Sequence, residues 1–196
     1  MKLKQIGEIE SGYPFRGKIA EVHGGEVVVV QMKNVSSVDG IDWSGCVTTR
    51  LTSKRDPSWL QTGDILVAAR GSRNYAVQVD LTKLHGRMRA VAAPHFFVIN
   101  IKNNVVLSDY LVWFLNQAPC QRYFEQNAEG SVTKSIRRSV LENVPVAVPP
   151  LKKQQAVIGL ADVLHQEQRT LEQLLQNGER LMGNLANDLL ATAVNE

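Results

Sequence analysis

Two arginines bracket a glycine turn in this 196-residue chain, in the run Arg70-Gly71-Ser72-Arg73-Asn74. The run directly follows an apolar stretch, Ile65-Leu66-Val67-Ala68-Ala69, which is typical of a buried strand. Guanidinium groups neutralise phosphates and can read guanine edges, and a glycine frees the backbone between them. The pattern indicates a surface that binds a polyanion such as DNA. The alternative is a plain turn on a solvated surface of mixed charge.

Positive charge is concentrated in the first part of the chain. The formal net charge is +3, but residues 1–150 carry 18 Lys or Arg against 13 Asp or Glu, and residues 151–196 carry 4 against 6. Between Arg50 and Arg89, eight Lys or Arg are accompanied by three Asp, which accounts for the whole excess of the first part. Because neutralised phosphates release counterions, such a basic strip suits a nucleic acid.

No catalytic motif is found in the sequence. Amino-methyltransferases hold the amine of a flipped base in an (Asn/Asp)-Pro-Pro-(Tyr/Phe) loop, whereas Pro149-Pro150 lies between Val148 and Leu151. There is no glycine-rich S-adenosylmethionine fingerprint, no P-loop and no nucleophile elbow. The four histidines are scattered, and Cys46 and Cys120 have no metal-binding spacing. We therefore predict a chain without catalytic residues, metal or cofactor.

The N-terminal residues and the cysteines bear on the cellular compartment. The segment Met1–Glu8 lacks the hydrophobic region of a secretion signal, and no apolar run has membrane-spanning length. Isolated cysteines suit a reducing environment. We expect a cytoplasmic protein.

Short strands dominate the pattern of residues 1–148. Predicted strands cover Val27–Met32, Ile65–Ala69, Ala90–Val91, Phe96–Ile101 and a closing strand Val144–Val148. Thr62-Gly63-Asp64 reads as the tight turn that starts the second of these strands. Ser108 is expected to cap a helix over Asp109–Asn116. Many short strands with one or two helices predict an α+β domain with a mixed sheet.

The residues after Pro149-Pro150 predict one long helix. Proline suits a first helical turn and disfavours helix in the residue before it, and no proline follows. A helix from about Leu151 to Leu190 would run roughly 60 Å. Its apolar positions alternate steps of four and three, as in a coiled coil: Val157, Ala161, Leu164, Gln168, Leu171, Leu175, Gly178, Met182, Leu185 and Leu189. We predict that residues 149–196 form a dimerisation helix along this stripe.

Two positions interrupt the apolar stripe. Gln168 and Gly178 are either weak points of an ordinary amphipathic helix or devices that fix the register and allow a close approach.

Five motifs occur in an order that resembles the specificity (S) subunits of type I restriction–modification systems. They are Gly12-Tyr13-Pro14-Phe15-Arg16-Gly17-Lys18, Val30-Gln31-Met32-Lys33-Asn34-Val35, the Gly63–Ser72 run, Gly130-Ser131-Val132-Thr133-Lys134-Ser135-Ile136, and the segment from Val144 to Gln154 that contains Pro149-Pro150-Leu151. Each motif is degenerate, but their order together with the long helix is specific. The resemblance covers nearly the whole chain.

The resemblance implies a non-catalytic, DNA-binding subunit that directs partner methyltransferase (M) and restriction (R) subunits. S-adenosylmethionine is then expected on the methyltransferase partner. The candidate DNA-binding residues combine the basic strip with the family motifs: Arg16, Lys18, Lys54, Arg55, Arg70, Ser72, Arg73, Asn74, Arg87, Arg89 and Lys134. We expect Arg70, Arg73, Arg87 and Arg89 to face the DNA together.

The chain also departs from the family pattern. Typical members carry two recognition domains and two spacer helices, and this sequence has one of each. A homodimer with antiparallel helices would restore the usual arrangement and read a bipartite, palindromic site. Two alternatives remain: a protein-interaction adaptor whose basic strip is incidental, and a degenerate fragment that does not bind DNA specifically.

Overall fold

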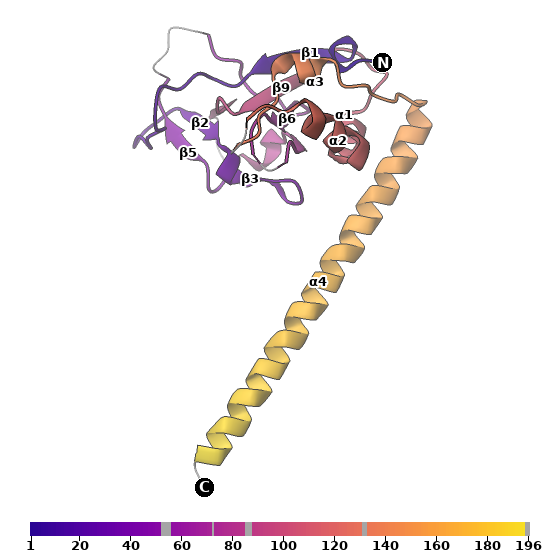
Figure 1. Ribbon diagram of the computed structural model, residues 1–196. Coiled ribbons are helices and arrows are strands. Elements are labelled where there is room, and N and C mark those ends of the chain that lie inside the picture. Colours follow the sequence, from indigo (N-terminus) through magenta and orange to yellow (C-terminus); the bar gives the residue numbers. More distant parts are fainter. Residues whose placement is uncertain (52–55, 72, 85–87, 131–132, 195–196) are drawn as a thin grey trace. The chain divides into compact units, whose positions relative to one another are not determined.

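The computed structural model describes residues 1–51, 56–71, 73–84, 88–130 and 133–194. The chain divides into two compact units, Met1–Gln154 and Gln155–Glu196, which we describe separately. The first unit holds the described strands and the short helices, and the second is the greater part of one long helix (Figure 1).

The larger sheet of the first unit has four antiparallel strands in the order β1-β9-β6-β7. They are β1 (Gly7–Ser11), β9 (Phe96–Ile101), β6 (Ile65–Ala68) and β7 (Ala76–Gln78). In the centre of this sheet Leu66 pairs with Val98 and Ile65 pairs with Ile99. Every residue of β6 is buried, so both faces of the strand are covered, as its unbroken apolar run predicts.

The smaller sheet is mixed and has the order β5-β2-β8. Strand β2 (Val27–Val30) runs antiparallel to β5 (Val47–Thr49) and parallel to β8 (Arg89–Ala92). Its four consecutive valines are all buried because one face packs against the larger sheet and the other against loop residues. The predicted α+β class with a mixed sheet is confirmed.

Short elements connect the sheets, and one of them shortens a predicted strand. Strands β3 (Val35–Ser36) and β4 (Gly40–Ile41) form a two-stranded ladder. The predicted strand Val27–Met32 ends at Val30, because Met32 begins the 3-10 helix η2 (Met32–Asn34). The Gln31 N–H donates to Asn34 Oδ1 at 3.1 Å and closes this turn. The other 3-10 helices are η1 (Leu3–Gln5) and η3 (Leu81–Lys83).

Three short helices complete the first unit: α1 (Ser108–Asn116), α2 (Ala118–Asn127) and α3 (Arg138–Glu142). The apolar face predicted for α1 is buried at Tyr110, Leu111 and Leu115. The predicted cap at Ser108 is wrong, because Leu107 occupies the N-cap position and makes no side-chain cap. The Ser108 hydroxyl instead accepts a hydrogen bond from the Gln78 side-chain amide and ties α1 to β7.

The predicted closing strand Val144–Val148 is also wrong. The segment is extended, and the Leu3 N–H donates to Val144 O at 3.1 Å, but it forms a single bridge, between Lys2 and Pro145, instead of a ladder. The Val146 N–H also donates to Met1 O at 2.7 Å, but the Val144 N–H donates to Leu141 O at 3.2 Å, so the pairing does not continue as a ladder. The segment leads into Pro149-Pro150 and the last helix.

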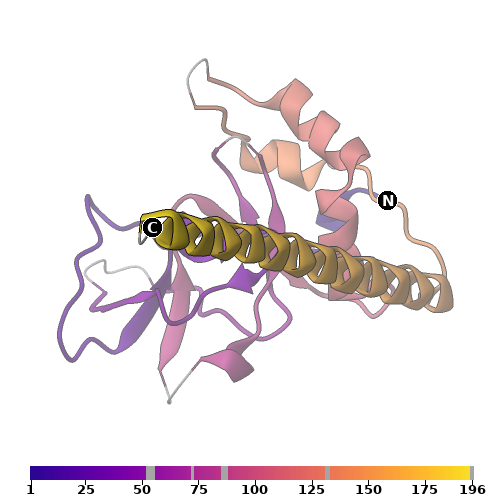
Figure 2. The same ribbon diagram turned by 90° about the horizontal axis from the view of Figure 1, so that it is seen from below.

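The last helix, α4 (Leu151–Val194), spans 44 residues and begins directly after Pro149-Pro150, as predicted. It extends a few residues beyond the predicted end near Leu190 and runs without a break in both views (Figure 1 and Figure 2). None of the helices in the described part of the chain is long and apolar enough to cross a membrane.

Candidate nucleic-acid interface

The Arg70 turn joins β6 to β7 and is held by backbone hydrogen bonds. The Ala68 N–H donates to Tyr75 O at 2.9 Å, and the Ala69 N–H donates to His95 O at 2.8 Å. Gly71 has φ of +124°, in a region that strongly favours glycine. Arg70 and Arg73 are both exposed. The hydrogen bonds of Ala69 and Gly71 fix the main chain on both sides of Arg70.

A segment distant in sequence lies against the Arg70 turn. The Gly71 N–H donates to Lys134 O at 3.1 Å, the Ile136 N–H donates to Ala69 O at 2.9 Å, and Arg70 forms an antiparallel bridge with Ser135. Lys134 is exposed. The fold therefore brings three exposed cations onto two adjoining segments. We call Arg70, Arg73 and Lys134 the Arg70 group.

The charges of the Arg70 group are not neutralised by carboxylates of the described residues. The ion pairs found there join other side chains: Lys83–Asp80, Lys102–Glu8, Arg137–Glu129 and Arg138–Glu142. Uncompensated cations on a fixed backbone are suited to bind phosphates, because little conformational freedom of the main chain is lost on binding.

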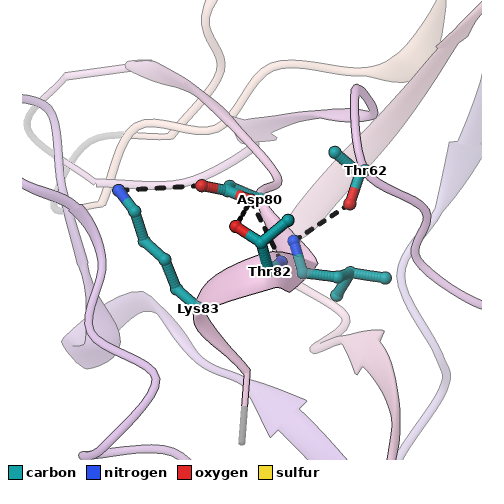
Figure 3. Close-up of polar contacts among 5 residues, drawn as sticks. Thr62, Asp80, Thr82 and Lys83 are labelled. Atoms are coloured by element: carbon teal, nitrogen blue, oxygen red, sulfur yellow. Dashed lines mark hydrogen bonds and ion pairs between the residues drawn. The ribbon is translucent and has the colours of Figure 1, made fainter.

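Lys83, a member of the basic strip, illustrates the opposite case. Its ammonium lies 3.8 Å from Asp80 Oδ2. The dashed line between the two side chains in Figure 3 marks this ion pair. Asp80 also accepts hydrogen bonds from the Thr82 side chain and backbone, which hold the pKa of this carboxyl below its usual range. The Leu81 N–H donates to the Thr62 hydroxyl at 3.1 Å. Lys83 thus belongs to a local turn-stabilising network.

Asn74 does not present its side chain to solvent. It is 5% exposed, and its amide donates to Ala68 O at 2.8 Å. The backbone carbonyl of Asn74 accepts a hydrogen bond from the buried Gln121 side-chain amide at 3.0 Å. This burial gives Asn74 a structural role in holding the Arg70 turn, and the DNA contact predicted for its side chain stays a prediction.

Arg89 belongs to a different group of cations. Its guanidinium lies 5.0 Å from the ring centroid of Trp59, and Trp59 packs on the face of the smaller sheet formed by Val27, Val29 and Val91. Phe15 and Ile19 pack on the same face and flank the exposed Arg16 and Lys18. We call Arg16, Lys18 and Arg89 the Arg89 group.

The Arg70 turn neighbours the opposite face of the smaller sheet. The Met32 Cε lies 3.4 Å from where a Cβ on Gly71 would stand, and Met32 packs with Val28 and Val30. The described residues therefore form two basic groups, and Arg89 is not brought together with Arg70 and Arg73. Lys54, Arg55, Ser72 and Arg87 lie outside the described residues.

Buried polar groups near the sites hold structure. Asp64 is 5% exposed and accepts hydrogen bonds from the Gln61 N–H at 2.8 Å and from Asn100 at 2.9 Å, while burial raises its pKa. Gly63, with φ of +97°, makes the turn before β6, as the sequence predicts. Burial also raises the pKa of the Cys46 and Cys120 thiols to about 11. Burial thus keeps the two thiols in their neutral forms, and two hydrogen bonds hold the Asp64 carboxyl in place.

The stripe predicted on α4 is largely exposed within the chain. Leu164, Leu171, Leu175, Met182 and Leu185 are 53–69% exposed. Val157 and Ala161 are partly exposed, Gln168 donates to Glu172 at 3.2 Å, and the side chain of Leu189 is outside the described part. Leu171, Leu174, Leu175, Gly178 and Met182 line one apolar hollow on the helix surface.

The sequence does not single out several residues that extend these surfaces. Leu160, Leu174 and Leu181 widen the apolar surface of α4 and recur at intervals of seven or fourteen, a signal that the sequence does carry. His95 is exposed beside the Arg70 turn, and Trp59 supports Arg89, but both positions depend on contacts between distant segments.

The fold and the site thus define a class of protein. It has an α+β domain with a basic surface, followed by a long helix with an exposed apolar stripe. The chain belongs to the family described as the Type I restriction modification DNA specificity domain, whose model matches residues 1–177. Specificity subunits form a non-catalytic family. Among curated relatives, the chain is 24% identical over 147 residues to the type I restriction enzyme StySPI specificity subunit of Salmonella potsdam. That match covers 74% of this chain and 32% of the relative.

Solved structures of specificity subunits have the same fold. The HsdS subunit of Thermoanaerobacter tengcongensis matches with a TM-score of 0.60 and 14% identity over 88% of this chain and 38% of that one. The S subunit of M. genitalium matches with a TM-score of 0.58 and 14% identity over 90% and 41%. A third match is a chain from a structure that describes complex assembly and conformational transition of the type I restriction–modification system. Its TM-score is 0.62 and its identity is 14%, and the match covers 94% of this chain and 42% of that one. The chain thus spans less than half the length of these relatives.

Proposed function

We propose that this chain is a specificity subunit that binds double-stranded DNA through the domain 1–148 and dimerises through the helix 149–196. As a homodimer it recognises a two-part, palindromic DNA site and directs partner methyltransferase and restriction subunits to that site. The observation that carries this proposal is the Arg70 group, three uncompensated cations on two hydrogen-bonded segments of a specificity-family domain.

The Arg70 group supports DNA binding by its chemistry. Each phosphate neutralised by a lysine or arginine releases counterions, so the affinity depends on salt and extends to all sequences. Arginine can also make paired hydrogen bonds to guanine O6 and N7 in the major groove. Arg70 and Arg73 are suited to these two purposes, and the backbone hydrogen bonds of Ala69 and Gly71 fix the main chain on both sides of Arg70.

The exposed stripe of α4 supports dimerisation. A helix of 44 residues is roughly 66 Å long at 1.5 Å per residue. Five apolar side chains of the predicted stripe are more than half exposed, and a coiled coil with a second copy would remove them from water. Antiparallel pairing gives a twofold assembly, which holds two domains apart and reads two identical half-sites.

DNA binding can be tested by fluorescence anisotropy on short duplexes at physiological salt, with and without the methyltransferase subunit. Arg70→Ala combined with Arg73→Ala should weaken binding to every duplex and lower the salt slope by about two units. Arg122→Ala, an exposed arginine on α2, is the matched control and should bind as the wild type does. Unchanged binding by the double variant would remove the Arg70 group from the interface.

Whether the chain directs a methyltransferase subunit to a DNA site can be tested with labelled S-adenosylmethionine and mixed-sequence DNA. The pure chain should transfer no methyl group. Adding the methyltransferase subunit should give methylation only at a two-part site. Methylation by the chain alone would contradict the proposal, and failure to bind DNA even with the methyltransferase subunit would favour an adaptor role.

A further inference from the structure

Gly178 opens the apolar hollow on the surface of α4. The hollow is lined by Leu171, Leu174, Leu175, Gly178, Glu179 and Met182. Apart from its chain neighbours and the backbone of its own helix, no described atom lies within 4 Å of where a Cβ on Gly178 would stand. In coiled coils a side chain of one helix inserts into such a hole between residues of the other helix. The hollow is therefore suited to receive a side chain from a second helix.

The stripe of α4 has a centre of symmetry at position 173. Gln168 lies five residues before this position, and Gly178 lies five residues after it. The two ends of the stripe, Val157 and Leu189, each lie sixteen residues away. The remaining positions are equidistant from 173 in pairs, which are Ala161 with Leu185, Leu164 with Met182, and Leu171 with Leu175. In a twofold dimer residue i contacts j and j contacts i, so an antiparallel pair centred here uses all ten positions.

We propose that two copies of α4 pair antiparallel about position 173, so that Gln168 of each copy packs into the hollow at Gly178 of the other. The inference rests on the homodimer of the proposed function and adds which residues meet in it. The two interruptions of the apolar stripe then compensate each other, because a long side chain faces a residue that has none. Ala161 opposite Leu185 repeats the same match of a small residue with a large one.

The hollow also offers a hydrogen-bond acceptor to the Gln168 amide. Glu179 lines the hollow and is exposed. Its carboxylate can accept from the Gln168 amide of the second copy, in place of the bond that Gln168 donates to Glu172 at 3.2 Å within one chain. A buried primary amide is costly without such an acceptor. The polar end of Gln168 is thus accommodated at the edge of the interface while its methylene groups fill the apolar hollow.

Other arrangements of two helices leave the interruptions uncompensated. A parallel pair sets Gln168 against Gln168 and Gly178 against Gly178, so two hollows face each other and remain unfilled. An antiparallel pair shifted by one heptad sets Gln168 against Leu171 or Leu185 and leaves two stripe positions unpaired at one end. Unfilled space loses the contacts that its lining would otherwise make. The sequence and the hollow therefore favour the pairing centred on position 173.

Gly178→Leu separates this inference from the alternative in which Gly178 is only a weak point of the stripe. In that alternative, leucine extends the apolar stripe and raises the helix propensity, so the dimer becomes tighter. In the proposed pairing, leucine occupies the space that Gln168 of the second copy requires. The dimer dissociation constant should then rise on the order of tenfold or more. Gly183→Leu, at an exposed glycine outside the stripe, is the matched control and should not weaken the dimer.

A second substitution tests the contact itself. Gln168→Ala added to Gly178→Leu should return the dissociation constant to within about threefold of the wild type. The pair would then be an alanine opposite a leucine, as at positions 161 and 185. Sedimentation equilibrium of the full-length chains gives the constants, and circular dichroism verifies that the helix is retained. A dimer that Gly178→Leu makes tighter would overturn the inference.

Spin labels measure the pairing independently of these substitutions. In full-length chains with Cys46→Ser and Cys120→Ala, one label is placed in turn at Gln166→Cys, Gln173→Cys or Arg180→Cys, which are exposed positions outside the stripe. About a centre at 173, labels at 166 and at 180 are each offset along the helices by 14 residues, roughly 21 Å. Electron–electron double resonance should therefore give equal distances at 166 and 180 and a shorter distance at 173.

The possible failures can be told apart. A parallel pair gives no offset at any of the three positions, and a shift by one heptad makes the offsets at 166 and 180 unequal, roughly 10 and 31 Å. Either result would overturn the inference and leave the proposed homodimer in place. A wild type that sediments as a monomer at tens of micromolar would refute the homodimer and the inference with it.

Discussion

The two units of the chain bury their apolar residues to different extents. In Met1–Gln154, Val29, Leu66 and Ile99 are fully buried between sheets and helices of the same chain. In Gln155–Glu196, Leu171 and Leu175 are more than half exposed. The first unit can therefore be stable on its own contacts, whereas the apolar stripe of the helix stays exposed to water unless the proposed dimer covers it.

The charge is divided in the same way. The positive excess lies before residue 150, and residues 151–196 carry a small negative excess. On the proposed function, DNA binding belongs to the basic domain and dimerisation belongs to the apolar, weakly acidic helix. Each function should then be removable without the other, and the following predictions test that independence.

The largest effect is expected from the helix. Leu164→Glu with Leu171→Glu places four carboxylates in the proposed dimer interface and removes leucines worth about 1.5–3 kcal/mol each when buried. The dimer dissociation constant should rise more than about 1000-fold. Light scattering should show monomers, and tryptophan fluorescence, which comes from Trp43, Trp59 and Trp113 of the first unit, should show an unchanged domain. A wild type that stays monomeric at tens of micromolar would contradict the prediction.

A substitution in the core of the domain should destabilise the domain and leave the dimer unchanged. Leu66→Ala in β6 removes a fully buried side chain and should lower the free energy of unfolding of the domain by about 2–5 kcal/mol. Urea unfolding followed by tryptophan fluorescence measures this change. The dimer dissociation constant should remain that of the wild type, and a parallel loss of dimer would show that the two units are not independent.

The thiols provide a chemical comparison of the two units. Burial raises the pKa of Cys46 and Cys120 to about 11. A cysteine introduced at the exposed Asn177 of α4 should keep a pKa near 8.5. At pH 8 the domain thiols should react with a disulfide reagent about 100-fold more slowly than the helix thiol, and their rate should still rise with pH up to about 11. Equal rates would show that the domain opens readily.

Local signals explain what the sequence predicts well. Pro149-Pro150 marks the start of α4 because the restriction on proline and on its predecessor acts within a few residues. The stripe on α4 follows a repeat that can be counted. The buried strand β6 follows from its apolar run and from the Gly63 turn before it.

Contacts between distant segments explain what the sequence does not predict. Lys134 lies at the Arg70 turn because residues 134–136 pair with residues 69–71, and Gln121 of α2 donates a hydrogen bond to the backbone of the buried Asn74. Strands β1, β5 and β7 and the helix α2 were missed because their patterns are short and weakly apolar and take shape against neighbours. The sequence places Arg89 in one basic strip with Arg70, whereas Arg89 lies over Trp59 on the face of the smaller sheet opposite to the one that the Arg70 turn neighbours.

The smallest effect is expected at Lys134, whose place in the interface depends on that nonlocal pairing. Lys134→Ala should weaken DNA binding about fivefold and lower the salt slope by about one unit, equally for all sequences, because a lysine acts as a point charge on phosphate. Lys83→Ala is the matched control, since Lys83 is paired with Asp80 and should leave the slope unchanged. Anisotropy titrations at several salt concentrations give both values. If Lys134→Ala keeps the wild-type salt slope while Arg70→Ala lowers it, residues 133–136 support the Arg70 turn without contacting DNA. The DNA-binding surface of this group would then consist of the β6–β7 turn alone.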